Sequence, residues 1–288
     1  MKLHEKTPDS VVCFLSGSLP GTALLHLRQL TLFGMISRLG HNVLCTIAID
    51  MLVEAKPTCQ SWFQQIRNIC IQYGLPHPLT ILEDPPNKLA FKRHCKLKIS
   101  VHWRKKLQLD ISKLKSVKYL KPEYLSLSKP HPIFTTLNGN PYQSRKARTQ
   151  ALFISGRYRT EQLCSYWSNN NDGICLLDTC RHHKIYEDLD HILFSCPGLN
   201  QTRTRLLNFT SNFILDKPEL QPLVTSCMYG EKQVFCQFLV GCSTLPEVLH
   251  LFQMLGPIVH TFLFYITRTW CHSLHRDRLR QLGRFPIS

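Results

Sequence analysis

The sequence predicts a mainly α-helical protein, and three observations support that prediction. Apolar residues recur at helical spacing in several segments, and these segments stop at glycine or proline. A long basic segment, residues 88–121, contains neither glycine nor proline. The 288 residues are 43% hydrophobic, which is typical of a globular chain that buries a core.

The N-terminal third predicts three helices. The stretch up to about residue 18 reads as irregular. A helix is expected over residues 24–39, where leucine and isoleucine follow the helical period until a glycine, and a second over residues 47–53. A third is expected to begin at a cap, Thr58 or Ser61, and to end at a Gly-Leu-Pro stop. The tract that follows, at residues 77–87, reads as a linker or turn.

Residues 88–121 carry twelve lysines or arginines and a single acid, so they supply +11 of the total net charge of +16. An apolar stripe at helical spacing runs through the segment, made of Ile99, Trp103, Leu107, Ile111 and Leu114. Part of the segment also alternates as a strand would, which leaves a strand as the alternative. A helix is preferred because the segment is long and lacks breakers.

The second half of the chain begins after a Pro-, Ser-, Asn- and Gly-rich stretch at 121–141. A short basic helix is expected at 144–155, another helix at about 203–215, and a long apolar helix from 254 into a basic tail. The apolar run at 254–266 is shorter than the ~20 residues that span a bilayer, so a buried helix is expected and no membrane partner. The predicted regions are 1–85, 86–140, 141–215 and 216–288.

The charge and the cysteines limit the class of protein. A pI of about 9.4 indicates an acidic partner, with nucleic acid first and an anionic membrane second, or else a basic surface that serves solubility. Thirteen cysteines are scattered without the dense framework of a small secreted protein, and Glu5 and Asp9 interrupt any signal peptide. An intracellular location, nuclear or cytoplasmic, is therefore expected.

The most informative motif is a possible zinc site with the spacing C-x4-C-x10-H-x4-C. Its members are Cys175, Cys180, His191 and Cys196. Zn²⁺ takes N and S ligands in a tetrahedron, and four protein ligands leave no position for water, so the site would be structural. Neutral imidazole and thiolates are needed, so acid should weaken the binding.

Two features of this motif leave an alternative open. His191 and Cys196 lie more than one helical turn apart, so a helix carrying the histidine must end near Ser195, before a Pro-Gly stop. The first cysteine pair is four residues apart where a knuckle usually has two. The alternative is three structural cysteines with a surface histidine, and His182 and His183 are rival ligands within the loop.

Nucleic-acid binding is predicted through three basic surfaces with a structural zinc beside them. The predicted contacts are Lys92, Arg93, Lys96, Lys98, Arg104, Lys105, Lys106, Arg145, Lys146, Arg148, Arg157, Arg159, Arg276, Arg278 and Arg280. Tyr158 or Trp167 is expected to stack on a base. The alternatives are a solvated lysine-rich face and, for Arg157 and Arg159, surface ion pairs with Glu161 or Asp172.

Motifs for catalysis are weak. Acids are scarce, no carboxylate pair has a suggestive context, and the TIAIDML tract has one aspartate without a second beside it. No glycine-rich phosphate loop occurs, and the Cys-His pairs lack a nucleophile context. The chain is therefore not expected to be an enzyme. A zinc-dependent hydrolase is a weak alternative, because it needs an open coordination position.

Several tracts resemble one family. They are FLSGSLPGTALLHLRQLTLFGMISRL, SWFQQIRNICIQYGLPHPLTIL, SGRYRTEQLCSYWS, CLLDTC with EDLDHILFSCPGL, and FYITRTWCHSLHRDRLRQLGRFP. Together they resemble the post-polymerase, C-terminal part of non-LTR retrotransposon polyproteins of the LINE type (chicken-repeat or Jockey-like). The resemblance covers nearly the whole chain, in the family's order.

The resemblance implies a helical thumb-and-linker-like region followed by a helical C-terminal region with a small CCHC zinc-knuckle-like loop. The family's ligands map onto Cys175, Cys180, His191 and Cys196, and its Arg-rich tract onto Arg157 and Arg159. In the family this segment helps to hold RNA and target DNA beside a reverse transcriptase. The paired polymerase aspartates and the endonuclease are not found in this sequence, so a non-catalytic fragment is expected. The alternative is a helical scaffold that packs on a separate reverse transcriptase domain.

Overall fold

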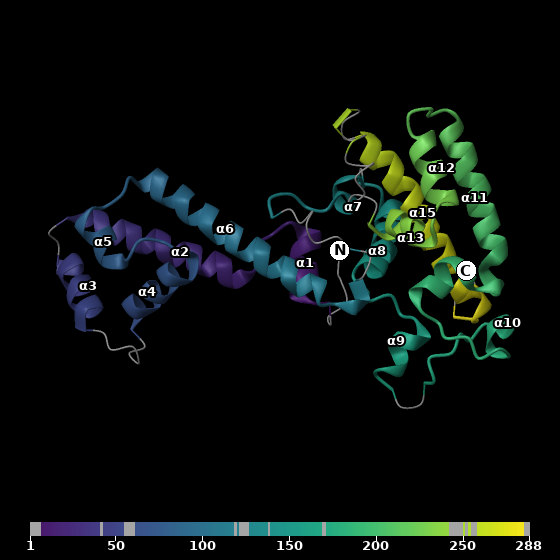
Figure 1. Ribbon diagram of the computed structural model, residues 1–288, viewed down its shortest axis with the longest axis horizontal. Coiled ribbons are helices and arrows are strands. Elements are labelled where there is room, and N and C mark those ends of the chain that lie inside the picture. Colours follow the sequence, from purple (N-terminus) through teal and green to yellow (C-terminus); the bar gives the residue numbers. More distant parts are fainter. Residues whose placement is uncertain are drawn as a thin grey trace.

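The computed structural model describes residues 7–40, 43–54, 61–117, 120, 127–137, 139–168, 171–241, 250, 253–254 and 258–284. Within these residues the protein is helical, and a single antiparallel bridge between Ile174 and Tyr186 stands in place of a sheet. The predicted mainly α fold is confirmed. Figure 1 shows two groups of helices, α2 to α5 on one side and α7 to α15 on the other, with the long helix α6 running between them.

The first group contains the predicted N-terminal helices. Its elements are α2 (Gly21–Ile36), η1 (Ser37–Leu39), α3 (Val43–Glu54), α4 (Trp62–Tyr73) and α5 (Pro78–Glu83), and helix α1 (Asp9–Ser16) precedes them in the chain. Ser61 caps α4, because its side chain accepts a hydrogen bond from the Gln64 amide at 3.2 Å. Gly74 ends α4 in the left-handed conformation, with φ of 60°. The rival cap, Thr58, lies outside the described residues.

Two helices occur where the sequence suggested irregular chain, and those predictions were wrong. Helix α1 forms within the first 18 residues and buries Val11 and Leu15 completely. Helix α5 forms in the tract that reads as a turn. Pro78 occupies its first turn, where a missing N–H costs nothing, and His77 Nδ1 accepts from the Leu79 amide at 3.3 Å. The proline therefore begins a helix there instead of breaking one.

Helix α6 (Lys88–Ser112) confirms the helical interpretation of the basic segment and excludes the strand. Its buried residues recur every fourth position: Phe91, Cys95, Ile99, Trp103, Leu107 and Ile111. Because each residue turns the helix by about 100°, a four-residue step moves the buried row about 40° around the axis. The indole Nε1 of Trp103 donates to the Tyr73 hydroxyl at 2.9 Å, which joins α6 to α4.

Helix α6 packs on α2, α4 and α1. The contact with α2 is close at Gly34, where a Cβ would lie 2.6 Å from the Phe91 ring. Figure 1 shows α1 beside the end of α6 that faces the second group of helices. The short helix η2 (Lys115–Val117) follows, and part of the predicted boundary, residues 121–126 and 138, lies outside the described residues.

The second group is built around α15 (Ile258–Gln281), which packs on α8, α11 and α13. The other elements are α7 (Pro132–Thr135), α8 (Pro141–Ile154), α9 (Glu161–Ser165), α10 (Asp178–Arg181), η4 (His191–Ser195), η5 (Pro197–Leu199), α11 (Asn200–Leu215), α12 (Gln221–Tyr229) and α13 (Lys232–Gly241). Trp270 is 1% exposed, and its Nε1 donates to the Thr210 hydroxyl at 2.8 Å. This contact fixes α15 against α11 in the core.

Among the described helices, no single one is both long and apolar enough to cross a membrane. Helix α1 and the α2–η1 segment meet the criteria of length and composition only as a pair, and that pair is bent by 72°.

Candidate metal centre

The structure brings the four motif residues into one buried cluster. The ligand atoms of Cys175, Cys180, His191 and Cys196 all lie within 4.8 Å of one another. Cys180 Sγ lies 3.4 Å from His191 Nε2 and 3.5 Å from Cys196 Sγ. A tetrahedral zinc ion with bonds of about 2.0–2.3 Å would separate its ligand atoms by about 3.5–3.8 Å. The cluster therefore fits a metal such as zinc, and the separation far exceeds the ~2.05 Å of a disulfide.

The first two cysteines lie on a short loop that the neighbouring backbone fixes. The Cys175 amide donates to the Ile185 carbonyl at 2.8 Å, next to the bridge between Ile174 and Tyr186. Helix α10 follows, and the Cys180 amide donates to the Leu177 carbonyl at 2.8 Å as that helix begins. The four residues between Cys175 and Cys180, two more than a zinc knuckle usually has, thus lead into a short helical turn.

His191 and Cys196 are brought to one side by a widened helical turn. In an α-helix, residues five apart lie about 140° from each other around the axis, so they face different directions. Here His191–Ser195 forms a π-helical turn, and the Cys196 amide donates to the His191 carbonyl at 2.8 Å. The side chain of Asp188 accepts from the His191 amide at 2.7 Å. The predicted helix end near Ser195 is confirmed, and the π turn is the feature that the sequence did not reveal.

The thiols are poorly placed to ionise without a cation. The hydrogen bond with Cys196, together with burial, raises the pKa of Cys175, and burial also raises the pKa of Cys180. A bound metal ion reverses this preference, because it stabilises thiolates directly. His182 and His183 are exposed and do not join the cluster of the described residues. The surface histidine of the alternative prediction is wrong, because His191 is 4% exposed and lies within the cluster.

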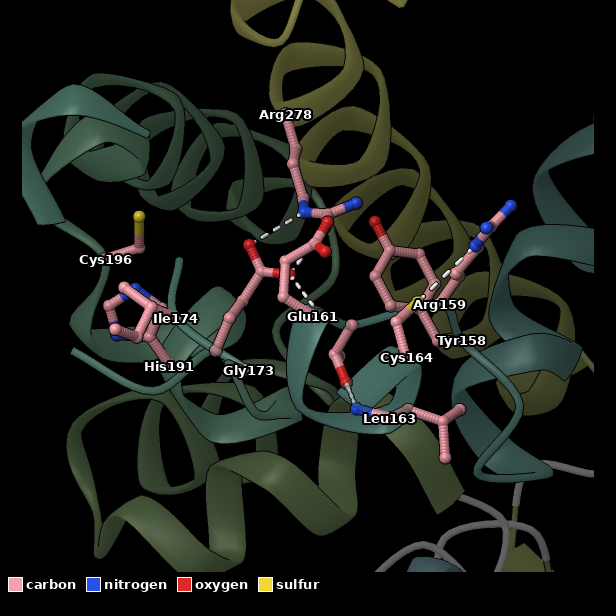
Figure 2. Close-up of polar contacts among 12 residues, drawn as sticks. Tyr158, Arg159, Glu161, Leu163, Cys164, Gly173, Ile174, His191, Cys196 and Arg278 are labelled. Carbon is pink, nitrogen blue, oxygen red and sulfur yellow. Dashed lines mark hydrogen bonds and ion pairs between the residues drawn. The ribbon is translucent and has the colours of Figure 1, made fainter. Parts of the chain in front are cut away.

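A second buried group lies near the cluster and contains Arg278 from α15 (Figure 2). Its Nε donates to Glu187 Oε2 at 3.0 Å, and its guanidinium also contacts Glu161 Oε1 at 3.2 Å. Burial lowers the pKa of Arg278, but the hydrogen bonds and charges of Glu187, Tyr158 and Glu161 outweigh burial and raise it. The group connects α9 and the loop before His191 to the end of the chain's last helix.

The predicted nucleic-acid contacts fall into two classes. The exposed cations are Lys92, Arg93, Lys96, Arg104, Lys105, Lys106, Arg145, Arg148, Arg159 and Arg280, while Lys98, Arg157 and Arg276 are half-buried. The predicted nucleic-acid contact is wrong for Arg278 and Lys146, because their side chains are buried and cannot reach a polyanion. Lys146 Nζ instead donates to the Thr269 hydroxyl at 3.1 Å, and burial lowers its pKa.

The tract around Tyr158 also departs from the prediction. Tyr158 is 4% exposed, packs on Phe153 with ring centroids 4.0 Å apart, and contacts His275 Nδ1 through its hydroxyl at 3.1 Å. It therefore cannot stack on a base, whereas Trp167 is 44% exposed and its stacking stays a prediction. The alternative of surface ion pairs for Arg157 and Arg159 is not found among the described residues. Arg159 Nε donates to Cys164 Sγ (Figure 2), and Glu161 pairs with Arg278 and Arg284.

Glu161 and Glu187 are the partners of Arg278, and the sequence indicated neither of these two pairings. They are separated from Arg278 by 117 and 91 residues respectively, so no local pattern connects them. The sequence offered no signal for them, because their burial, which requires cationic partners, follows only from the fold.

Comparison of the chain with protein-family models, curated proteins and solved structures found no match. The fold and the Cys3His cluster therefore rest on the geometry described above. The resemblance to non-LTR retrotransposon polyproteins remains a hypothesis carried by the quoted tracts.

Proposed function

We propose that this protein binds nucleic acid through the basic surface of α6, without reading sequence, and that a structural zinc in the Cys3His cluster braces the second group of helices. The observation that supports this proposal is that the lysines and arginines of α6 lack carboxylate partners. Helix α6 contains eight lysines and arginines, and none forms an ion pair with a carboxylate of the described residues. Their charge is available to an external polyanion.

The geometry of α6 suits a phosphate backbone. Its 25 residues extend for about 37 Å, a length that several nucleotides of an extended strand can follow. Arg104, Lys105 and Lys106 are consecutive and exposed. Lys106 Nζ lies 4.5 Å from the centre of the Trp103 ring, so a cation–π contact holds this lysine without neutralising it.

In this proposal the zinc has a structural part only. Cys175, Cys180, His191 and Cys196 would hold it, and four protein ligands leave no position for a reacting water. The metal would staple the loop at 175–180 to the π turn before α11. The exposed cations act through their own charge. Removing the metal should therefore weaken nucleic-acid binding only if it also unfolds the protein.

Salt dependence tests nucleic-acid binding directly. Fluorescence anisotropy with a labelled single-stranded RNA should show log affinity falling with log salt by about 0.7 per phosphate neutralised. The triple variant Arg104→Gln/Lys105→Gln/Lys106→Gln should bind about 10-fold or more weakly at low salt and lower the slope by about two units. A matched control, Arg28→Gln/Lys129→Gln/Arg205→Gln, removes the same net charge from scattered exposed positions and should bind almost normally. Equal losses in the two triples would contradict a role specific to α6.

Metal content tests the zinc site separately. Protein purified without chelators should contain about one zinc per chain, and His191→Ala should lose most of it. His183→Ala is the matched control, because that histidine is exposed and outside the cluster. Wild-type protein without zinc after refolding in zinc-containing buffer would refute the metal site and leave the nucleic-acid proposal to its own test.

A second function, a scaffold for a reverse transcriptase domain, is favoured by a different observation. Helices α2 and α3 expose large apolar side chains, among them Leu25 (55%), Leu32 (50%), Met35 (52%), Val43 (71%) and Ile47 (45%). Exposed apolar surface of this extent is typical of a protein interface. This interpretation also agrees with the proposal that the chain is related to the C-terminal part of a non-LTR retrotransposon polyprotein.

The scaffold proposal is tested by the behaviour of the isolated chain. Light scattering should detect concentration-dependent association, and the double variant Leu32→Lys/Val43→Lys should suppress it without lowering helicity. The control Leu97→Lys alters an equally exposed leucine on α6 and should leave association unchanged. A wild-type chain that stays monomeric at high concentration would count against the scaffold.

A further inference from the structure

Arg203 is a buried cation directly behind the metal cluster. It lies in the first turn of α11, and the residue is 9% exposed. The guanidinium donates to the backbone carbonyl of Cys196, one of the four ligands, and lies 3.5 Å from the carbonyl of Ile192. Both carbonyls belong to the segment that contains the π turn.

Arg203 differs from the buried cations Arg278 and Lys146 in having no compensating group among the described residues. Arg278 is paired with Glu187 and Glu161. Lys146 lies over the rings of Tyr142 and Tyr265, at 4.7 and 5.3 Å. Neither a carboxylate nor an aromatic ring of the described residues is placed to do this for Arg203. Burying an uncompensated charge is strongly unfavourable, so a negative charge nearby is expected.

The metal centre can provide that charge. Three thiolates and one neutral imidazole around a divalent ion carry a net charge of −1. The sulfurs of Cys196 and Cys180 are close enough to Arg203 to affect it. Burial lowers the pKa of Arg203, while negative charge on Cys196 and Cys180 acts in the opposite direction.

We propose that Arg203 is the counter-ion of a metal–thiolate centre, so that the buried arginine and a Cys3His-bound divalent cation stabilise each other. The inference rests on the metal-binding part of the proposed function and not on nucleic-acid binding. It assigns a role to a residue outside the ligand motif. It also accounts for the charge type of the ligand set, since three thiolates match one buried cation whereas two would leave the arginine uncompensated.

The test compares zinc affinities measured by competition with a chromophoric chelator. Arg203→Gln removes the charge and keeps a hydrogen-bond donor, and it should weaken zinc binding about 10- to 100-fold, as expected for a residue next to the ligands. Arg203→Lys keeps the charge and should recover most of that loss. The matched control Arg205→Gln, on the same helix but with a 63% exposed side chain, should bind zinc as the wild type does. If a variant folds only when metal is bound, its zinc affinity can be measured instead from the gain of helicity in a zinc titration followed by circular dichroism.

Exchanging one ligand distinguishes a charge effect of Arg203 from a purely structural one, because it changes the charge of the centre. Cys175→His makes the centre neutral, so the further change Arg203→Gln should then cost much less affinity than it does in the wild-type background. Equal losses in both backgrounds, or a lysine variant as weak as the glutamine variant, would overturn the proposal. Failure of the wild type to bind zinc would be a different result and would refute the metal site itself.

Discussion

Helices α6 and α15 are both long and basic, yet they use their positive charge differently. Helix α6 has 25 residues whose cations mostly face solvent and have no carboxylate partner among the described residues. Helix α15 has 24 residues, but its Arg278 is buried between Glu187 and Glu161, and its Arg280 pairs with Asp277 at 2.9 Å. Positive charge in a sequence therefore does not distinguish a ligand-binding surface from an internal ion pair. The difference comes from acids close to α15: Glu187 and Glu161 from other parts of the fold, and Asp277 from the helix itself.

The largest effect expected from this comparison is on stability. Arg278→Met should lower the free energy of unfolding by about 3–5 kcal/mol, because Glu187, which is 0% exposed, loses its partner. Urea denaturation measures this loss. Arg104→Met on α6 should change the same quantity by less than about 0.5 kcal/mol. A loss below about 1 kcal/mol for Arg278→Met would show that the Arg278–Glu187 ion pair is not a buried interaction on which the packing of α15 depends.

Acid should destabilise the α15 side of the comparison next. Burial, followed by nearby positive charges, lowers the pKa of His272 and of His275 to about 4. The unfolded chain then binds more protons than the folded one between pH 6.5 and 4, so their contribution is complete above pH 6.5 and falls as the pH drops towards 4. Each histidine contributes at most about 1.4 kcal/mol per pH unit in this window.

Urea midpoints at several pH values measure this dependence, and zinc-free protein avoids a contribution from metal release. His272→Gln should flatten the curve between pH 6.5 and 4. His94→Gln, an exposed histidine on α6, is the control and should leave the curve unchanged. An identical slope for wild type and His272→Gln would contradict the assignment.

A smaller effect is expected when cations are removed in pairs and nucleic-acid binding is measured. Lys92→Gln/Lys96→Gln on α6 should lower the salt slope by about 1.4–1.8 units, the value for two phosphate contacts. Arg276→Gln/Arg280→Gln on α15 should lower it by less, because Arg280 is already paired with Asp277. Equal decreases for the two pairs would remove the distinction between the helices.

The smallest effect is expected at the exposed pair between α11 and α15. Arg205 contacts Asp277 at 3.0 Å, but the arginine side chain is 63% exposed. Arg205→Gln should therefore change the free energy of unfolding by no more than about 1 kcal/mol. A loss as large as that of Arg278→Met would mean that burial does not separate the two kinds of ion pair.

Local patterns predicted those parts of the fold in which the deciding residues are close in sequence. Helix α4 was found from Ser61 and Gly74, and α6 from its uninterrupted apolar stripe. The four residues of the Cys3His cluster were also predicted to lie together, since their types and spacing are those of a metal-ligand set. Helix α5 was missed because residues 77–87 were interpreted as a linker or turn, although Pro78 suits the first turn of a helix.

The remaining differences depend on contacts that the sequence cannot show. Arg278 was assigned to a polyanion because its neighbours are basic, while its actual partner Glu187 lies 91 residues away. Tyr158 was assigned to base stacking, but it packs on Phe153 and reaches His275. The π turn at His191 was not predicted because it has no composition of its own and follows from where Cys196 must point.

The four-residue repeat of buried positions on α6 limits the shape of whatever binds there. From Phe91 to Ile111 the inward side rotates by about 200°, so the two ends of the helix present their lysines and arginines in nearly opposite directions. A flat anionic sheet such as a bilayer could engage one end at a time. A flexible polymer could wind along the whole path, so longer oligonucleotides should gain affinity that anionic vesicles of equal charge density cannot match.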